Sequence, residues 1–72
     1  MSSRVRVHAG TVSAFDAHKG YGTVTGDDGE TWFFHCTQIA DGTRTIPNGV
    51  NVEFELVPGR NGRWEAAHIH RC

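Results

Sequence analysis

Apolar and polar side chains alternate with a period of two along most of this chain, and clusters of Gly, Pro, Asp and Asn interrupt the alternation. A period of two is typical of a β-strand that buries one face, whereas an amphipathic helix repeats about every 3.6 residues. The clearest run extends from Val50 to Leu56, where four apolar residues alternate with Asn and Glu. The pattern therefore predicts an all-β chain.

The alternation predicts five strands joined by tight turns and one longer loop. They cover residues 4–12, 20–25, 31–36, 50–56 and 64–69. A bend or bulge is expected at Gly10 in the first strand. Turns rich in Gly, Asp and Asn follow the second and fourth strands, and the longer loop at 37–48 begins with a short helical turn.

The chain has 72 residues, which provide for a single domain, over 1–72, with one small core. Five short strands in such a chain favour a closed barrel, because closure pairs the sheet edges that would otherwise be exposed. The alternation assigns these apolar positions to the core: Val5 or Val7, Val12, Val24, Trp32, Phe34, Val52, Phe54 and Ile69.

Charge and cysteine content limit the classes of function. The chain has seven basic and eight acidic residues, for a net charge of −1. This near-neutral charge argues against a polycation that coats duplex DNA by charge alone. No apolar run approaches the roughly 20 residues of a membrane helix, and no secretory pattern begins the chain. We therefore expect a cytoplasmic protein without membrane contact, in which Cys36 and Cys72 stay reduced. A disulfide between them is the less favoured alternative.

An unusual group of side chains falls on the outer face of the second and third strands. If Val24, Trp32 and Phe34 fill the core, the alternation directs the other set outward together: Lys19, Tyr21, Phe33 and His35. Exposed rings on a small protein usually mark a binding site. Bases of single-stranded nucleic acid are flat partners for such rings, and each stacked base contributes about 1–3 kcal/mol. The alternative is that these rings pack under the loop at 37–48.

Two motifs give the sequence a resemblance to a known family. Residues 10–24 read Gly-Thr-Val-Ser-Ala-Phe-Asp-Ala-His-Lys-Gly-Tyr-Gly-Thr-Val, and residues 32–36 read Trp-Phe-Phe-His-Cys. They resemble the opening of the bacterial cold-shock proteins, usually Gly-Thr-Val-Lys-Trp-Phe-Asn then Lys-Gly-Phe-Gly-Phe-Ile, and their second ribonucleoprotein motif, usually Val-Phe-Val-His-Phe. The match continues in order to Ile69. The resemblance implies a five-stranded antiparallel OB-fold barrel that binds single-stranded RNA and DNA and acts as an RNA chaperone or regulator.

The resemblance also implies which residues contact nucleic acid: Phe15, Lys19, Tyr21, Phe33 and His35. The face on which Phe15 lies depends on the bulge expected near Gly10. Arg60, Arg63 and Trp64 lie near the turn where the family often has a contacting Lys. We expect the two arginines to contact phosphates, while Trp64 either adds a stacking ring or packs against the protein.

The chain departs from the family at four surface positions. Ser13 stands in place of a Lys, Ala14 in place of an exposed Trp, and Thr23 and Cys36 each in place of a Phe. Because three rings and one cation are missing, we expect weaker binding than in a typical member. The reduced surface and near-neutral charge also leave an alternative function, a cold-shock-like fold used as a protein-interaction module.

Catalytic and metal sites lack support in the sequence. His68, His70 and Cys72 fall on one strand face, but they would span about 13 Å, too far to share one zinc ion. No phosphate loop, nucleophile elbow or pair of catalytic carboxylates occurs. We therefore expect no enzyme activity, metal, cofactor or small-molecule substrate, and we expect a monomer.

Overall fold

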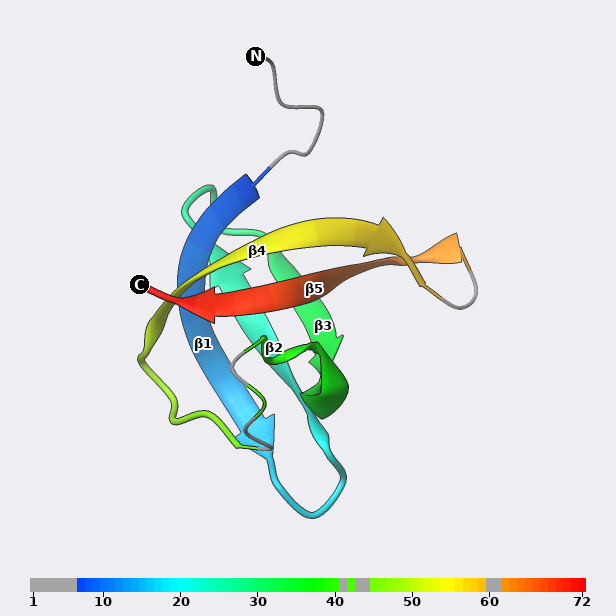
Figure 1. Cartoon of the computed structure of the whole chain (residues 1–72). Helices are drawn as coiled ribbons and strands as arrows, with labels where there is room; N and C mark the ends of the chain where they lie inside the picture. The colour runs from blue at the N-terminus through cyan, green and yellow to red at the C-terminus, as the bar shows by residue number, and fades with distance from the viewer. Residues whose placement is uncertain (1–6, 41, 43–44, 60–61) are drawn as a thin grey trace.

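Five strands, in the order predicted, make up most of the computed structural model, which describes residues 7–40, 42, 45–59 and 62–72 (Figure 1). The elements are β1 (Val7–Asp16), β2 (Tyr21–Gly26), β3 (Thr31–His35), the 3-10 helix η1 (Cys36–Gln38), β4 (Asn51–Pro58) and β5 (Trp64–Arg71). The short helical turn falls at the start of the longer loop, as predicted. Within the described ranges no helix has the length and apolar character needed to cross a bilayer.

The strands close into a barrel in the order β1-β2-β3-β5-β4, so the predicted all-β barrel is confirmed. Four neighbouring pairs are antiparallel, and one pair, β3 with β5, is parallel through Phe33 and Glu65. The prediction that every strand pair is antiparallel was therefore wrong at this junction. The reason is that η1, the long loop and β4 intervene between β3 and β5, and a crossover connection can return the chain in the same direction.

β1 bends because it pairs with two strands, with β4 near its start and β2 near its end. Gly10 belongs to both pairings, opposite Gly26 and Val52, and a Cβ there would collide with the Thr25 carbonyl oxygen. The register shift itself lies between Val12 and Ala14. The bend predicted at Gly10 is therefore separate from the bulge, which occurs later along β1.

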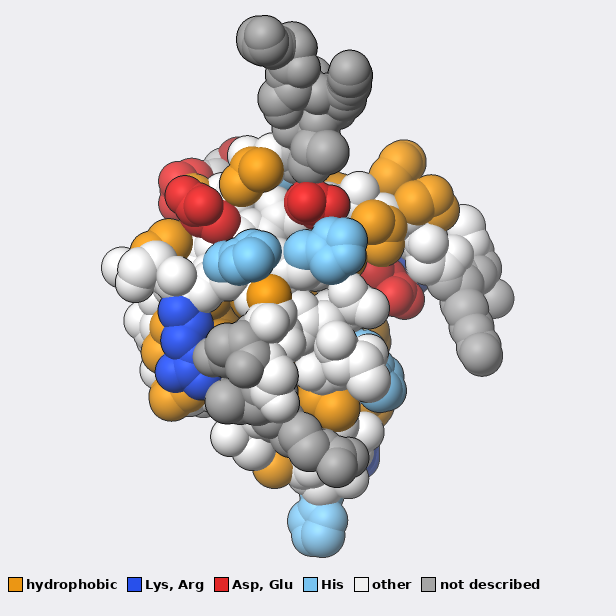
Figure 2. Space-filling view, in the orientation of Figure 1, with side chains coloured by type: hydrophobic (Ala, Val, Ile, Leu, Met, Phe, Trp, Pro, Cys, Tyr) orange, Lys and Arg blue, Asp and Glu red, His pale blue; other side chains and the backbone are white. Residues whose placement is uncertain are grey.

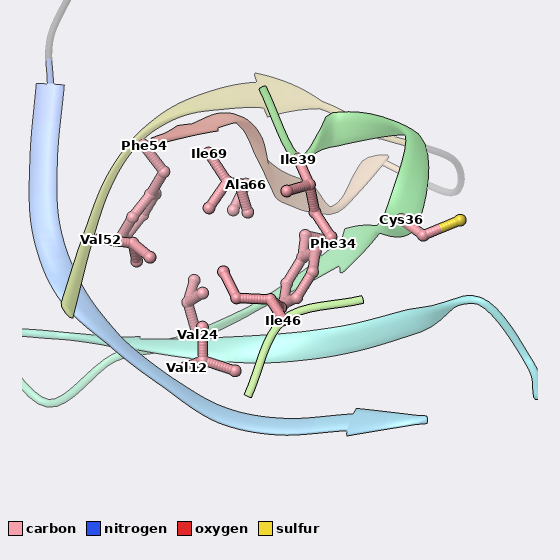
Figure 3. Packing of buried hydrophobic residues seen from close by; sticks show 10 residues of the cluster. All are labelled: Val12, Val24, Phe34, Cys36, Ile39, Ile46, Val52, Phe54, Ala66 and Ile69. Atoms are coloured by element: carbon pink, nitrogen blue, oxygen red, sulfur yellow. The ribbon is translucent and has the colours of Figure 1, made fainter. Parts of the chain in front are cut away.

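The core confirms the predicted inner faces of the strands (Figure 3). Six predicted residues are almost fully buried: Val12, Val24, Phe34, Val52, Phe54 and Ile69. Trp32 is only half-buried, although it packs against this cluster. Val7 is 58% exposed, because the inner face of β1 continues from Val12 through Gly10 to His8, whose ring stacks on Phe54. Val5 lies outside the described residues.

The longer loop supplies core residues that strand periodicity did not predict. Ile39 and Ile46 are buried with Phe34, as Figure 3 shows. Ile39 forms a parallel bridge with Ile69, and the Ala40 N–H donates to the Ile69 carbonyl oxygen at 2.8 Å. The described residues of the loop thus cover the interior of the barrel, and they leave Tyr21 and Phe33 exposed on the outer face of β2 and β3.

Candidate nucleic-acid interface

The pairing of β2 with β3 determines which side chains reach the surface. Tyr21 lies opposite His35, and Thr23 lies opposite Phe33, whereas Gly22 lies opposite the buried Phe34. Cross-strand partners point to the same side of a sheet, so the first two pairs share the outer face. Tyr21 is 39% exposed and Phe33 is 58% exposed.

The rings of Tyr21 and Phe33 stack on each other, with centroids 5.7 Å apart and planes at 22°. These rings, together with Phe34, His35 and Glu65, line an open depression of about 650 Å³, which we call the aromatic depression. Its size falls within the ~300–1,000 Å³ typical of sites for small ligands. Both outer rings are partly exposed, as stacking of a planar ligand requires.

His35 has a second role besides its place in the aromatic depression. Its Nδ1 accepts a hydrogen bond from the Thr37 N–H at 3.4 Å and lies 3.1 Å from the Thr37 hydroxyl, so the ring caps η1. In a neutral imidazole that accepts through Nδ1, the proton sits on Nε2. The cap therefore holds the ring in place at the edge of the aromatic depression.

Lys19 occupies the turn that leads into β2. The Asp16 carboxylate accepts from the backbone N–H groups of His18 and Lys19, at 3.0 and 3.1 Å, and Gly20 closes the turn with a φ of 79°. This local hydrogen bonding is typical of an Asx-type turn. It places an exposed cation two residues before Tyr21, although Lys19 itself does not line the aromatic depression.

The structure does not bring Phe15 together with Tyr21. Phe15 pairs with Gly22 and stacks on Phe34, with centroids 5.8 Å apart and planes at 13°. Gly22 makes this possible, since a Cβ there would collide with the Ala14 carbonyl oxygen and crowd the Phe15 ring. Phe15 is therefore half-buried on the inner side of the sheet, at its boundary with solvent.

The turn between β4 and β5 carries the remaining predicted contacts. Arg63 is exposed, and its carbonyl oxygen accepts from the Gly59 N–H at 2.6 Å. Trp64 is 54% exposed, but it does not line the aromatic depression. As neighbours on β5, Trp64 and Glu65 point to opposite faces, and Glu65 is the one beside Phe33. Arg60 lies outside the described residues.

The three positions where the chain lacks a family ring are not equivalent. Ala14 and Thr23 pair with each other, and Thr23 also pairs with Phe33, so both extend the outer face of the sheet. The Thr23 hydroxyl lies 2.9 Å from that of Ser13. Cys36 instead is buried in the core cluster. The exposed surface has therefore lost rings beside Phe33, whereas the change at Cys36 concerns packing.

Glu65 is a residue of the aromatic depression that sequence reasoning missed. It pairs with Phe33 across the parallel junction and lines the depression from β5. Strand alternation could place it on an outer face but could not show which strand lies beside it. No local pattern signalled this neighbour, because the pairing of β5 with β3 joins segments far apart in the sequence.

Histidine and acidic side chains gather over β4 and β5 on another part of the barrel (Figure 2). The His68 Nδ1 lies 2.9 Å from the Glu55 Oε1, and the backbone of His68 has a φ of 51°. Among the described residues, no group of three or more potential ligands has the arrangement of a metal site. Cys36 and Cys72 are both free.

The comparisons with known proteins agree with this architecture. The family model described as the 'Cold-shock' DNA-binding domain matches residues 8–72. The "Cold shock-like protein" of Thermotoga maritima is 43% identical over 61 residues, which cover 83% of this chain and 91% of that protein. The "Cold shock-like protein CspLB" of Listeria monocytogenes is 37% identical, covering 78% of this chain and 86% of that protein. "Glycine-rich protein 2" of Nicotiana sylvestris is 42% identical, and the match covers 83% of this chain and 29% of that longer protein.

Proposed function

Because this chain belongs to the family of the 'Cold-shock' DNA-binding domain, we propose that it binds single-stranded RNA and DNA through the aromatic depression. The observation that carries the proposal is the exposed, stacked pair Tyr21 and Phe33. In a duplex the faces of the bases are covered by neighbouring base pairs, so only unpaired bases can stack on these rings. Each stacked base would contribute about 1–3 kcal/mol with little dependence on its identity.

The cations of this surface supply the contacts to the backbone of the ligand. Lys19 and Arg63 are exposed, and the proposal includes Arg60 in the same role. Phe15 and Trp64 contribute at the margin of the surface, since neither lines the aromatic depression. With so few cations, affinity rests on stacking more than on charge.

The proposal extends to the use of this binding. A protein that holds unpaired bases by stacking shifts RNA toward its single-stranded form, which is the activity of an RNA chaperone or of a regulator of transcripts. We propose a cytoplasmic monomer that binds rather than catalyses. We also propose weaker binding than in members with full platforms, because Ala14 and Thr23 remove rings beside Phe33.

Titration tests the proposal directly. Thymidine heptamers and single-stranded RNA of the same length should quench or shift the Trp fluorescence and move the NMR signals of Tyr21, Phe33 and His35. A duplex of equal length is the matched control and should bind less tightly. The absence of any response at concentrations on the order of tens of micromolar in low salt would contradict the proposal.

The second candidate is a protein-interaction module, favoured by the open positions at Ala14 and Thr23. It predicts that a polypeptide, and not an oligonucleotide, occupies the aromatic depression. The Tyr21→Ala, Phe33→Ala variant separates the two functions. Under the nucleic-acid proposal this variant loses oligonucleotide binding, whereas under the alternative it loses only a partner captured by the wild-type protein.

A further inference from the structure

A carboxylate lies beside the stacking rings, at a position where a phosphate-binding surface would place a cation. Glu65 is the partner of Phe33 across the parallel junction, and both residues line the aromatic depression. In the sheet, the order β2-β3-β5 puts β3 between Glu65 and the end of β2 that follows Lys19. Glu65 thus adds an anion on the β5 side of the two rings, while Lys19 lies in the turn that precedes Tyr21 at the start of β2.

The Glu65 side chain extends toward the turn between β4 and β5. Its carboxyl group lies against Gly59, where any Cβ would collide with it, and Gly59 is itself fixed by its N–H bond to the Arg63 carbonyl oxygen at 2.6 Å. Within the described part of the chain, no hydrogen bond or ion pair engages the Glu65 carboxylate, whereas the Glu55 carboxylate is paired with His68. Its oxygens therefore remain available as acceptors.

A carboxylate only accepts hydrogen bonds, which makes it selective among base edges. Guanine presents two adjacent donors, N1–H and N2–H, and can meet both oxygens at once. Cytosine and adenine present an amino group beside an acceptor nitrogen, and thymine and uracil present a single N–H between two carbonyl groups. Bidentate, charge-assisted bonds are the strong ones, so a carboxylate at the edge of a stacked base favours guanine.

We infer that Glu65 selects the base that stacks on Phe33 and gives this protein a preference for guanine at that position. The inference rests on the proposed function, because it requires a base in the aromatic depression. The charges of Lys19 and Glu65 set the orientation of the strand: the phosphates run on the side of Lys19, away from the anion, and the edge of the base meets Glu65. Stacking supplies affinity at this site, and Glu65 supplies discrimination.

The test uses thymidine heptamers that carry guanine, hypoxanthine, cytosine or thymine at the central position, in competition against a labelled heptamer followed by fluorescence anisotropy. A single guanine avoids self-association of the oligonucleotide. We expect the guanine heptamer to bind roughly ten-fold more tightly than the thymine heptamer. Hypoxanthine, which keeps N1–H but lacks the amino group, should fall between them.

Glu65→Gln isolates the carboxylate at almost constant shape. The amide presents one acceptor beside one donor, which matches the edges of guanine and thymine equally well, so the preference should fall below about two-fold. Glu53→Gln is the matched control, because it removes an exposed carboxylate of β4 that does not line the aromatic depression, and it should keep the full preference.

The outcomes separate this inference from the function on which it rests. Tight binding of all four heptamers with equal affinity would overturn the role of Glu65 and leave single-strand binding intact. A guanine preference that survives in Glu65→Gln would overturn the role as well. Failure of every heptamer to bind the wild-type protein would overturn both proposals.

Discussion

Two outer surfaces of this barrel follow the same alternation and have opposite chemistry. The aromatic depression on β2, β3 and β5 exposes stacked rings, and the only side-chain hydrogen bonds of its described residues are those between His35 and Thr37. The surface on β4 and β5, which we call the histidine–carboxylate face, carries Glu53, Glu55, His68 and His70. There the closest side chains bind each other, as His68 does with Glu55.

The difference shows that exposure alone does not make a site. Polar side chains on the histidine–carboxylate face are hydrated or paired, so their exposure has little free-energy cost. The apolar rings of Tyr21 and Phe33 have no such compensation, and only part of their surface is covered by each other. The unsatisfied surface is therefore the one expected to bind a ligand.

Removing the rings of Tyr21 and Phe33 should have the largest effect on the difference in binding between the two surfaces. Tyr21→Ala with Phe33→Ala deletes two stacking surfaces, and we expect oligonucleotide affinity to fall at least about thirty-fold. The matched control is Glu55→Gln with His68→Ala, which alters the histidine–carboxylate face to a similar extent. Fluorescence anisotropy measures affinity, and circular dichroism checks that each variant is folded. Equal losses in both variants would show that the two surfaces do not differ in binding.

Adding a ring next to the aromatic depression should increase the difference in oligonucleotide binding between the two surfaces. Thr23 lies opposite Phe33 on the outer face, so Thr23→Phe adds a ring to the existing stack. We expect roughly ten-fold tighter binding, because one more base can stack. The change also removes the contact between the hydroxyls of Thr23 and Ser13, which is exposed and of small weight. His70→Phe adds the same ring to the histidine–carboxylate face and should leave the affinity unchanged.

Salt dependence should show that charge is the smaller contribution. With Lys19, Arg60 and Arg63 as the phosphate contacts, the slope of log K against log salt should be no steeper than about −2. Lys19→Gln should reduce its magnitude by about 0.7, the value for one phosphate on a single strand. Arg71→Gln, which changes a cation elsewhere on β5, should not alter it. A slope near −5 would instead indicate a ligand held mainly by its backbone.

The ion pair on the histidine–carboxylate face should have the smallest effect. The His68 side chain is 62% exposed, so water screens its interaction with Glu55. We expect Glu55→Gln to change the free energy of unfolding by less than about 1 kcal/mol, measured by urea denaturation. Oligonucleotide affinity should not change. A decrease of several kcal/mol in the free energy of unfolding would mean that this ion pair is a major contribution to the stability of the barrel.

Local periodicity was sufficient to predict which side chains of β2 and β3 face outward. Alternation within β2 and β3 placed Tyr21 and Phe33 outward and Phe34 inward, because the period of two depends only on neighbouring residues. The face of Phe15 was not predictable in this way, since the bulge lies between Val12 and Ala14 and not at Gly10. A single-residue shift in register moves a side chain to the other side of the sheet.

The sequence did not predict the contacts between segments that lie far apart along the chain. Glu65 reaches the aromatic depression only because β5 lies parallel to β3, and no short-range pattern specifies that neighbour. Ile39 and Ile46 enter the core from a loop without periodicity. Val7 fits the alternation of an apolar strand position, yet the parity of β1 places it on the outside.

The junction of β3 with β5, which we call the seam, is also the shortest strand pairing among the described residues of the barrel. It has one pair of residues in register, Phe33 with Glu65, and the bridge of Ile39 to Ile69 supports it. The pairing of β1 with β2 has six such residue pairs. A closed sheet opens first where fewest backbone bonds must break, so native-state hydrogen exchange should be fastest at this seam. A base that rests on Phe33 and bonds Glu65 ties the two strands together. If a base binds as proposed, occupancy of the site and closure of the barrel form one coupled equilibrium, in which bound ligand lowers the population of the open barrel.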